Sequence, residues 1–433
     1  MPTLIENLYK LFCQHPVICT DSRNIKPDSI FFALKGENFN GNEFAESALK
    51  KGAEYAVIDE ENFNKSNRFI LVENVLETLQ HLAVYHRGKI NLPVIGITGT
   101  NGKTTTKELI AAVLKKKFKV VATSGNFNNH IGVPLTVLGI SNDTEIAIIE
   151  MGANHIGEIS ALCNISKPGF GIITNIGKAH LVGFGSIEAI IKAKAELYKF
   201  ISNNEGLVFV NSDNNTLKQL AKYLQKVTYG TSENSNCRTK IISSDPFVEI
   251  LWNSGFGDVS IKSNLVGKYN FENILAAICV GDYFNVKIEN IAQAIEEYIP
   301  QNNRSQFINT KKNKIFLDAY NANPSSMEAA IRNFAELNFK NKILIIGDML
   351  ELGNESLSEH SKILKLIREL GFDNVFLIGA EFYEANKNSG HKIFPKTEDA
   401  MQWFEANRLE NATIFIKGSR GIKLEPLIKV FKV

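Results

Sequence analysis

The stretch from Pro93 to Leu114, PVIGITGTNGKTTTKELIAAVL, has the composition of a phosphate-binding loop between a strand and a helix. Glycines let backbone N–H groups close around an anion, and the helix N-terminus adds partial positive charge. A lysine there is disfavoured by the dipole unless an anion is also present. We therefore expect Lys103 to reach the outer phosphates of a nucleotide and Thr104 to reach Mg²⁺. The predicted phosphate-binding residues are Gly99, Thr100, Asn101, Gly102, Lys103, Thr104 and Thr105.

The spacing of this loop departs from the common GxxxxGK[ST] pattern. That pattern requires glycine at position 97, which is Ile97, and Gly96 lies one residue too early. A ligand-free turn rich in glycine and threonine would have a similar composition. The succession of apolar strand, glycine loop, lysine, threonine and amphipathic helix favours phosphate binding over that alternative.

One acidic residue and two histidines follow later apolar runs of the same region. Glu150 ends the run EIAIIE, and we predict that it ligates a metal ion beside the phosphates, although an acid at a strand end is often only a loop residue. His155 and His180 follow successive strands, at the sheet edge where open α/β folds bind ligands. We expect His180 to contact metal and His155 to contact substrate or metal, against a purely structural role for each.

Alternating apolar strands and helical patterns must position these residues. Strands are predicted at 94–98, 145–150, 170–176 and 206–211, with helices at 105–117 and 187–201 between them. Strands without polar alternation are typical of a parallel sheet covered on both faces. The segment 247–265 reads as an antiparallel pair around a glycine turn, and 270–284 returns to helix.

The pattern starts afresh on either side of this region. Residues 30–58 read as strand, polar loop, short helix and strand, and the strands and helices after residue 300 predict a second doubly wound sheet. We predict an α/β protein of three domains: a small N-terminal α/β domain, 1–88; a central ATPase-type domain with a mostly parallel sheet, 89–300; and a C-terminal Rossmann-like domain, 301–433.

Composition excludes several other classes of protein. The chain has 433 residues, a formal net charge of +2 and 22% charged residues, so no basic excess favours nucleic acid or anionic membranes. Five scattered cysteines without a CxxC pair fit a reducing cytosol better than a disulfide framework. We find no secretory leader and no apolar run near the length of about 20 residues that spans a bilayer.

Several segments together resemble the Mur ligases of bacterial peptidoglycan synthesis. They occur in the family's order over nearly the whole chain: GITGTNGKTTTKE, GNFNNHIGVPLTVL, EMGANHIGEI, NIGKAHLVGFGS, KAKAELY, LDAYNANPSSMEAAI, GDMLELG and KGSRGIKLE. The pair EMGANHIGEI and DAYNANPSSM is similar to the branch that joins D-alanyl-D-alanine to UDP-N-acetylmuramoyl-tripeptide.

The resemblance implies a cytoplasmic, monomeric, ATP-dependent amide ligase that works through an acyl phosphate. It implies an N-terminal domain for the UDP end of the substrate, a central ATPase domain, and a C-terminal domain that closes over ATP and admits the dipeptide. Lys103, Lys194, His180 and Arg304 would be catalytic, and Thr104, Glu150, His180 and a carbamylated Lys194 would ligate Mg²⁺. Without the resemblance, Lys194 would read as a helix-surface lysine like its neighbour Lys192.

The resemblance also implies contacts for the nucleotide and the substrates. Asn273 would read adenine, Arg304 would contact the γ-phosphate and Asp318 would hold the ribose, while Asn321 and Asn323 would shape the loop beside ATP and dipeptide. The implied substrate-binding residues are Asp21, Ser22, Arg23, Asn128, Asn129 and His155. One departure from the family lies nearby, because the chain has Asn42 where relatives often have histidine.

Two alternatives remain open at this point. A sister ligase that adds a diamino acid or glutamate, or a folylpolyglutamate synthase, shares the general motifs but not YNANPSSM. A nucleotide-dependent switch would need the phosphate loop, but it would have no use for Lys194 and His180 beside Glu150. The sequence does not indicate the third residue of the tripeptide or the base that deprotonates the amine.

Overall fold

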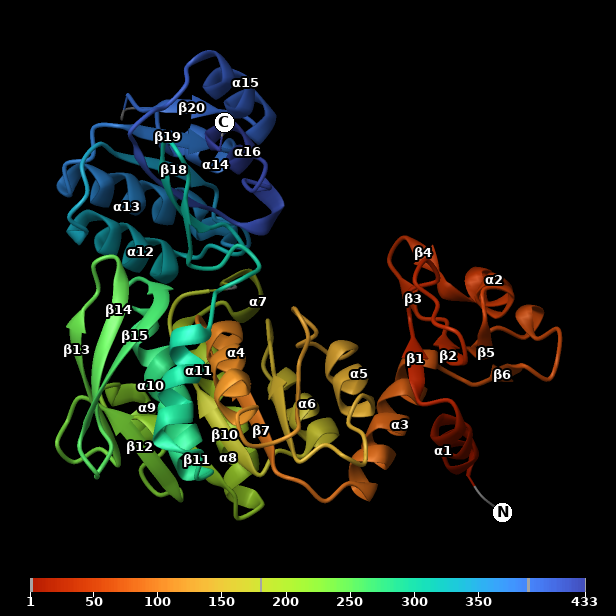
Figure 1. Cartoon of the computed structure of the whole chain (residues 1–433). Helices are drawn as coiled ribbons and strands as arrows, with labels where there is room; N and C mark the ends of the chain where they lie inside the picture. Colours follow the sequence, from red (N-terminus) through yellow and green to blue (C-terminus); the bar gives the residue numbers. More distant parts are fainter. Residues whose placement is uncertain (1–2, 180, 388–389, 433) are drawn as a thin grey trace.

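The computed structural model describes residues 3–179, 181–387 and 390–432 and has three α/β parts. In Figure 1 the central part lies between the N-terminal part, drawn in red, and the C-terminal part, drawn in blue. The predicted α/β class and the mostly parallel central sheet are confirmed. None of the helices in the described ranges is long and apolar enough to cross a membrane.

The N-terminal part contains a parallel sheet with the strand order β1-β2-β5-β6. The predicted strand, helix and strand of this part are present, and a two-stranded hairpin, β3–β4, lies within the predicted polar loop. Its elements are α1 Leu4–Gln14, β1 Val17–Cys19, β2 Ser29–Phe32, β3 Lys35–Gly36, β4 Phe39–Asn40, η1 Gly41–Phe44, α2 Ala45–Lys50, β5 Ala53–Ile58, η2 Glu61–Phe63, β6 Phe69–Leu71 and α3 Val75–Lys89.

Helix α3 packs on both the N-terminal and the central part. It contacts α1 and β2 on one side and α5 and α6 on the other, and one continuous core includes Leu8 of α1, Leu79 of α3 and Leu162 of α6. The ring of His86 extends this connection, since its Nδ1 lies 3.2 Å from the Tyr9 hydroxyl and its Nε2 lies 2.9 Å from the Ile140 carbonyl oxygen. The first two parts therefore share a layer of packing.

The central sheet has nine strands in the order β15-β14-β13-β12-β11-β10-β7-β9-β8. Strands β8 to β13 are parallel to their neighbours along this order, and β13, β14 and β15 form an antiparallel end. The strands are β7 Val94–Thr98, β8 Val120–Ala122, β9 Ile146–Glu150, β10 Phe170–Ile173, β11 Leu207–Asn211, β12 Lys226–Gly230, β13 Cys237–Ser243, β14 Phe247–Asn253 and β15 Asp258–Val266.

Helices cover both faces of this sheet, as the apolar strands predict (Figure 1). Residues of α4, α10 and α11 pack on one face, and residues of α5, α6 and α8 pack on the other. The helices are α4 Lys103–Leu114, α5 Gly132–Leu138, α6 Glu158–Ser166, α7 Leu181–Phe184, α8 Ile187–Asn203, α9 Asn215–Leu220, α10 Asn270–Tyr283 and α11 Ile288–Glu297.

The C-terminal part contains a sheet with the order β16-β17-β21-β18-β19-β20, parallel except at β16. Helices α12 to α14 pack on one face, and α15 and α16 pack on the other. The elements are β16 Gln306–Asn309, β17 Lys314–Asp318, α12 Pro324–Glu336, β18 Lys342–Gly347, η3 Gly353–Glu355, α13 Ser356–Glu369, β19 Val375–Ile378, α14 Ala380–Ala385, β20 Lys392–Phe394, α15 Thr397–Ala406, β21 Thr413–Lys417, η4 Arg420–Ile422 and α16 Leu427–Phe431.

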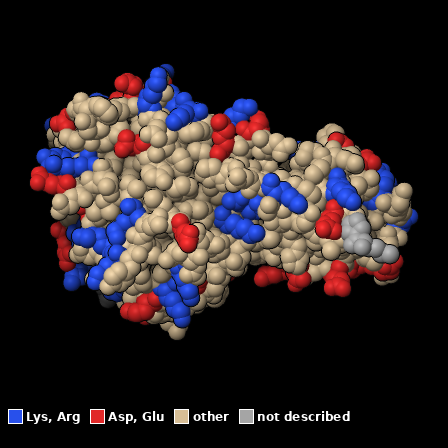
Figure 2. Space-filling view, turned by 90° about the horizontal axis from the view of Figure 1, so that it is seen from below, with Lys and Arg blue, Asp and Glu red and all other residues tan. Residues whose placement is uncertain are grey.

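Charged side chains of both signs are distributed over the surface. Figure 2 shows Lys and Arg interspersed with Asp and Glu on the face that it presents, in keeping with the net charge of +2. This face offers no extended basic surface of the kind that nucleic acid requires.

Candidate functional site

The predicted phosphate loop connects the end of β7 at Thr98 to the start of α4 at Lys103. Gly102 caps the helix with φ of 78°, a left-handed conformation that favours glycine. A Cβ atom at this position would also lie 2.5 Å from the Asn273 side-chain oxygen. Backbone conformation and close packing both explain why the position before Lys103 is glycine.

The start of α4 offers donors to an anion. Its first intrahelical bond runs from the Thr106 N–H to the Gly102 carbonyl, so the N–H groups of the preceding helical residues have no acceptor within the helix. The Lys103 ammonium donates to the carbonyls of Gly99 and Thr100, at 2.8 and 2.9 Å. Burial lowers the pKa of Lys103 to about 8, against the opposing attraction of Glu150. This end of the helix therefore fits phosphate.

Glu150 ends β9, beside the phosphate loop, and is buried. Its Oε1 accepts hydrogen bonds from the Thr104 hydroxyl at 3.2 Å and the Asn128 amide at 2.8 Å. Its Oε2 is buried without a hydrogen-bond partner among the described residues, and the Lys107 ammonium lies 3.8 Å away. A buried carboxylate oxygen without a donor, next to a threonine hydroxyl, fits a Mg²⁺ ligand.

Lys194 is buried on α8 rather than exposed on its surface. Its Nζ lies 3.5 Å from the Ala153 carbonyl oxygen and 5.5 Å from the centre of the Phe184 ring. Burial lowers the pKa of this amine to about 7, and the nearby Lys103 acts in the same direction. A buried lysine with this pKa is substantially neutral near pH 7, which fits an amine that reacts with CO₂ to form a carbamate.

Of the two histidines predicted at the site, only His155 lies within the described residues. His180 lies outside the described residues. His155 is exposed, with its Nδ1 at 3.7 Å from the Glu158 carboxylate, and its side chain does not line the cavity described below. Within residues 3–179, 181–387 and 390–432, no three His, Cys, Asp or Glu side chains form a group that could hold a metal ion by themselves.

The predicted nucleotide residues line the opposite side of the loop. The Asn273 oxygen accepts a hydrogen bond from the Thr106 hydroxyl at 3.0 Å, and its amide donates to Asn270. The Arg304 guanidinium lies 3.6 Å from the centre of the Tyr320 ring, and its Nε is buried without a hydrogen-bond partner among the described residues. A buried guanidinium nitrogen without an acceptor fits a phosphate or carboxylate ligand.

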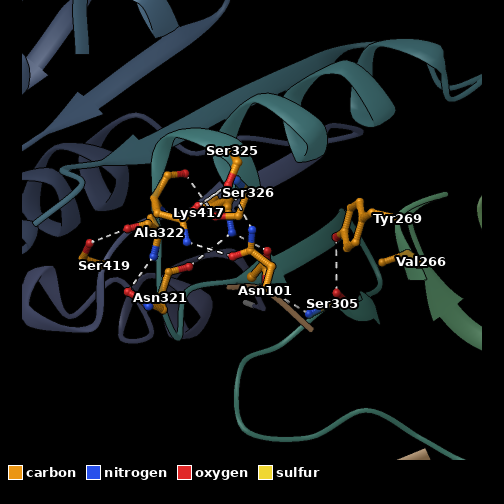
Figure 3. A network of polar contacts seen from close by, with 12 residues as sticks. Asn101, Val266, Tyr269, Ser305, Asn321, Ala322, Ser325, Ser326, Lys417 and Ser419 are labelled. Carbon is orange, nitrogen blue, oxygen red and sulfur yellow. Dashed lines mark hydrogen bonds and ion pairs between the residues drawn. The ribbon is translucent and has the colours of Figure 1, made fainter. Parts of the chain in front are cut away.

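Asp318 and its surroundings belong to the C-terminal part. Its carboxylate accepts from the Lys417 ammonium at 2.5 Å and from the Ser305 N–H at 3.3 Å. Lys417 also donates to the Asn321 carbonyl at 3.3 Å, and Asn323 is the N-cap of α12. Figure 3 shows Lys417, Asn321 and the start of α12 facing Asn101 of the phosphate loop.

A cavity of about 1200 Å³ brings most of these residues together. Its lining includes residues of α3 and α6 as well as Lys417 of β21. The predicted site residues that line it are Thr100, Asn101, Gly102, Lys103, Thr104, Thr105, Asn128, Asn129, Glu150, Asn273, Arg304, Asp318, Asn321 and Asn323. Gly99 and Lys194 do not line the cavity, but each contacts a residue that does. The Gly99 carbonyl accepts a hydrogen bond from Lys103, and the Lys194 ammonium lies next to the Ala153 carbonyl.

The predicted uridine residues lie elsewhere. Asp21 and Arg23, just after β1, pair with each other at 2.9 Å, and hydrogen bonds from Arg23 lower the pKa of Asp21 to about 2. Neither they nor Ser22, whose carbonyl accepts from Lys51, line the cavity. Asn42 is buried, where its side chain bonds both the N–H and the carboxylate of Asp59. A structural contact therefore occupies the position of the family's histidine.

Sequence reasoning missed several residues of the site, among them Lys417, Tyr320 and Lys107. Lys417 is buried against Asp318, and the two are register partners at the ends of the parallel strands β21 and β17. A lysine closing the apolar run ATIFIK was the available signal. Tyr320, under Arg304, and Lys107, beside Glu150, gave no signal beyond their neighbours in the motifs.

Comparisons with known proteins agree with this arrangement. The profiles described as Mur ligase family, catalytic domain, Mur ligase middle domain, and Mur ligase, glutamate ligase domain match residues 16–97, 97–281 and 303–420. UDP-N-acetylmuramoyl-tripeptide--D-alanyl-D-alanine ligase of Bacillus subtilis is 35% identical, over 95% of this chain and 92% of that protein.

Solved structures give the same picture. The crystal structure of MurF from Acinetobacter baumannii matches with a TM-score of 0.86 and 28% identity, over 96% of this chain and 93% of that one. MurF ligase from Thermotoga maritima in complex with ADP matches with a TM-score of 0.85 and 25% identity, over 100% and 98% of the two chains.

Proposed function

The chain belongs to the Mur ligase family, and from this premise we propose that it joins D-alanyl-D-alanine to UDP-N-acetylmuramoyl-tripeptide at the expense of ATP. Full-length similarity to ligases that carry this name supports the substrates. The observation that carries the proposal is the cavity where Lys103, Glu150 and Arg304 meet. These residues come from a phosphate loop, a neighbouring strand and the start of the C-terminal part, as an ATP-dependent ligase requires.

Joining a carboxylate to an amine requires activation because a carboxylate is a poor electrophile. A carboxylate oxygen of the tripeptide attacks the γ-phosphorus of ATP, and ADP leaves. The dipeptide amine then attacks the acyl carbon of this acyl phosphate, and the resulting tetrahedral intermediate expels phosphate to leave the amide. Lys103, the N–H groups at the start of α4 and Arg304 stabilise the charge on the transferring phosphoryl group.

Thr104 and Glu150 are the residues that would hold Mg²⁺, and His180 completes this set by family resemblance. When bound, the ion supplies Lewis-acid stabilisation of phosphoryl oxygens. Lys194 would contribute to the same site as a carbamate, since its low pKa and its burial suit that modification. Carbamylation would replace an amine that is partly cationic at pH 7 by an anion, which is the charge that a metal ligand requires.

The remaining contacts follow the family. Asn273 and Asp318 contact adenine and ribose, Asn321 and Asn323 shape the loop beside ATP and dipeptide, and Asn128 and Asn129 face the tripeptide arm. His155, which is exposed outside the cavity lining, is assigned to the tripeptide by the family resemblance alone. Asp21, Ser22 and Arg23 contact the uridine end, away from the cavity. The protein acts as a monomer in the cytoplasm, where ATP and the nucleotide-linked precursor are available.

A phosphate-release assay tests this function directly. Purified protein with Mg²⁺ and ATP should release phosphate only when both UDP-N-acetylmuramoyl-tripeptide and D-alanyl-D-alanine are present. A panel of amine acceptors should give the dipeptide as the preferred substrate. Preference for a diamino acid or glutamate would identify a sister ligase, and release without either substrate would contradict ligation altogether.

A further inference from the structure

A ring of three hydrogen bonds joins the phosphate loop to the start of α12 (Figure 3). The Asn101 amide donates to the Ser325 hydroxyl at 3.0 Å, and that hydroxyl donates to the Asn323 oxygen at 2.9 Å. The Asn323 amide in turn donates to the Asn101 oxygen at 2.8 Å. Residue 101 is 224 positions from residue 325. The ring therefore connects the central part to the C-terminal part.

The C-terminal side of this ring is a fixed structure. Asn323 caps α12 through a hydrogen bond from the Ser326 N–H, and Ser326 returns a bond from its hydroxyl to the Asn323 carbonyl. Pro324 occupies the first turn, where its restricted φ suits the helix start. Asn323 and Ser325 thus present their polar groups to the central part from a rigid helix end.

The backbone of Asn101 is held independently by its own domain. Its N–H donates to the Asn175 side-chain oxygen at 2.9 Å, and its carbonyl accepts from the Thr174 hydroxyl and the Asn175 amide, at 2.6 and 3.1 Å. These residues follow β10. The shape of the phosphate loop therefore does not depend on α12, whereas both polar atoms of the Asn101 side chain are bonded to it.

Gly177 makes the close approach of the two parts possible. A Cβ atom there would lie 2.9 Å from the Ser325 hydroxyl oxygen and 3.3 Å from its Cβ. The backbone of Gly177 is tied to the phosphate loop, because its N–H and its carbonyl both bond the Thr100 hydroxyl, at 3.0 and 3.1 Å. A larger side chain there would have to displace the Ser325 side chain, and with it the hydrogen bonds of the ring.

We infer that the Asn101 side chain is a docking contact for the C-terminal part instead of a phosphate ligand, and that the ring Asn101–Asn323–Ser325, seated on Gly177, sets where that part docks over the loop. This assigns Asn101 and Ser325 as positioning residues. Docking brings Arg304 and Asp318 to the cavity. The link between docking and catalysis rests on the function proposed above, but the docking contact itself does not.

A double-mutant cycle separates this inference from the phosphate-ligand alternative. Because the three bonds form one ring, Asn101→Ala, Ser325→Ala and the double variant should reduce kcat by similar factors, between about twofold and tenfold. All three should leave the fold intact and shift small-angle scattering toward an extended form, with and without a non-hydrolysable ATP analogue. Gly177→Ala should do the same while leaving every ring residue in place.

Asn333→Ala is the matched control. Its side-chain oxygen accepts the Lys268 N–H at 2.9 Å, another contact between the central and C-terminal parts, but one remote from the phosphate loop. This variant should scatter like the unmodified protein.

Calorimetry of ATP-analogue binding to the variants tests the alternative that the Asn101 side chain is a phosphate ligand. If Asn101→Ala weakens analogue binding while Ser325→Ala has no effect on scattering or kcat, Asn101 is a phosphate ligand and the inference fails. Additive effects of the two substitutions would also overturn it. If the unmodified protein fails to bind the analogue, the proposed function fails, while the scattering comparison without analogue still tests the ring.

Discussion

At the scale of single residues, Lys103 is the side chain on which phosphate binding depends most directly. Replacing it by alanine removes the only flexible cation of the loop, so we expect ligation to fall by at least about 100-fold while thermal unfolding is unchanged. Lys115→Ala is the control, since Lys115 is an exposed lysine at the other end of the same helix. Near-normal turnover of Lys103→Ala would contradict the role of the loop.

Lys194 gives a prediction about pH. The pKa of its amine in the folded protein is about 7 and its ordinary value is 10.5. Above pH 7 the amine is mainly neutral and can take up CO₂, so bicarbonate-dependent activity should decline as the pH falls through 7. We expect Lys194→Ala to lose activity that short carboxylic acids partly restore. Lys192→Ala, two residues away and exposed, should retain full activity.

The lowered pKa of Lys194 also makes the free energy of unfolding depend on pH. Between pH 7 and 10.5 the unfolded chain binds more protons at Lys194 than the unmodified folded protein, so this residue makes stability rise with pH over that window. In bicarbonate-free buffer, Lys194→Met should therefore unfold at a higher temperature than the unmodified protein at pH 7, and this difference should shrink toward pH 10. A difference that is independent of pH would rule out a buried, unmodified amine.

Sequence reasoning located the residues of the site better than their partners. Lys103, Glu150 and Asn273 were predicted individually, and they line one cavity. The bond between Asn101 and Ser325 could not be predicted, because it depends on how two separately folded sheets meet. The burial of Lys194 could not be predicted either. The sequence of α8 is amphipathic, but its pattern does not indicate whether Lys192 or Lys194 lies on the exposed side.

At the scale of elements, the turn into α4 depends on Gly102. Alanine there would have to adopt φ near 78° and would approach the Asn273 oxygen, so Gly102→Ala should destabilise the protein by about 1–2 kcal/mol and strongly reduce nucleotide binding. Denaturant unfolding and calorimetry would measure the two effects.

Gly371→Ala is a control that separates the effect of backbone strain at Gly102 from the effect of its contact with Asn273. Gly371 has φ of 71°, and a Cβ atom at this position would meet no other atom within 4 Å, so it shares the backbone conformation without the contact. The substitution should cost about 1 kcal/mol and leave nucleotide binding unchanged. Equal nucleotide binding in both variants would contradict the role assigned to the turn at Gly102.

Elements with a strong apolar pattern were predicted well and the others were not. The strand 94–98 was predicted with the bounds that β7 has, and the antiparallel pair at 247–265 is present as β14 and β15. Strand β13 was missed because CRTKIIS mixes charged and apolar residues, and its place in the sheet depends on pairing with β14. Strand β8 has only three residues, too few for a periodic signal.

At the scale of the whole molecule, ligands should favour the docked arrangement of the C-terminal part. Its contacts with the central part include the ring at Asn101, the ion pair of Lys178 with Glu359 at 3.2 Å, and the packing of Phe247 of the central part on Phe307. Relative motion of two domains joined in one chain is the default expectation. The radius of gyration should decrease when an ATP analogue and UDP-N-acetylmuramoyl-tripeptide are both bound, and no change would count against closure.

The packing of α3 affects how this enzyme could be recombined with its relatives. Hydrogen bonds from Arg87 to the carbonyls of Ser166 and Lys167 join its last turn to the central sheet region, while its other side covers the first sheet. A chimera that takes residues 1–89 from another ligase would place a foreign α3 against α5 and α6 of the central part. Grafts cut ahead of Asn74 would keep the packing of α3 on α5 and α6 and would exchange only its smaller contact with α1 and β2. Exchange of segments between relatives should therefore be tolerated better ahead of Asn74 than after residue 89.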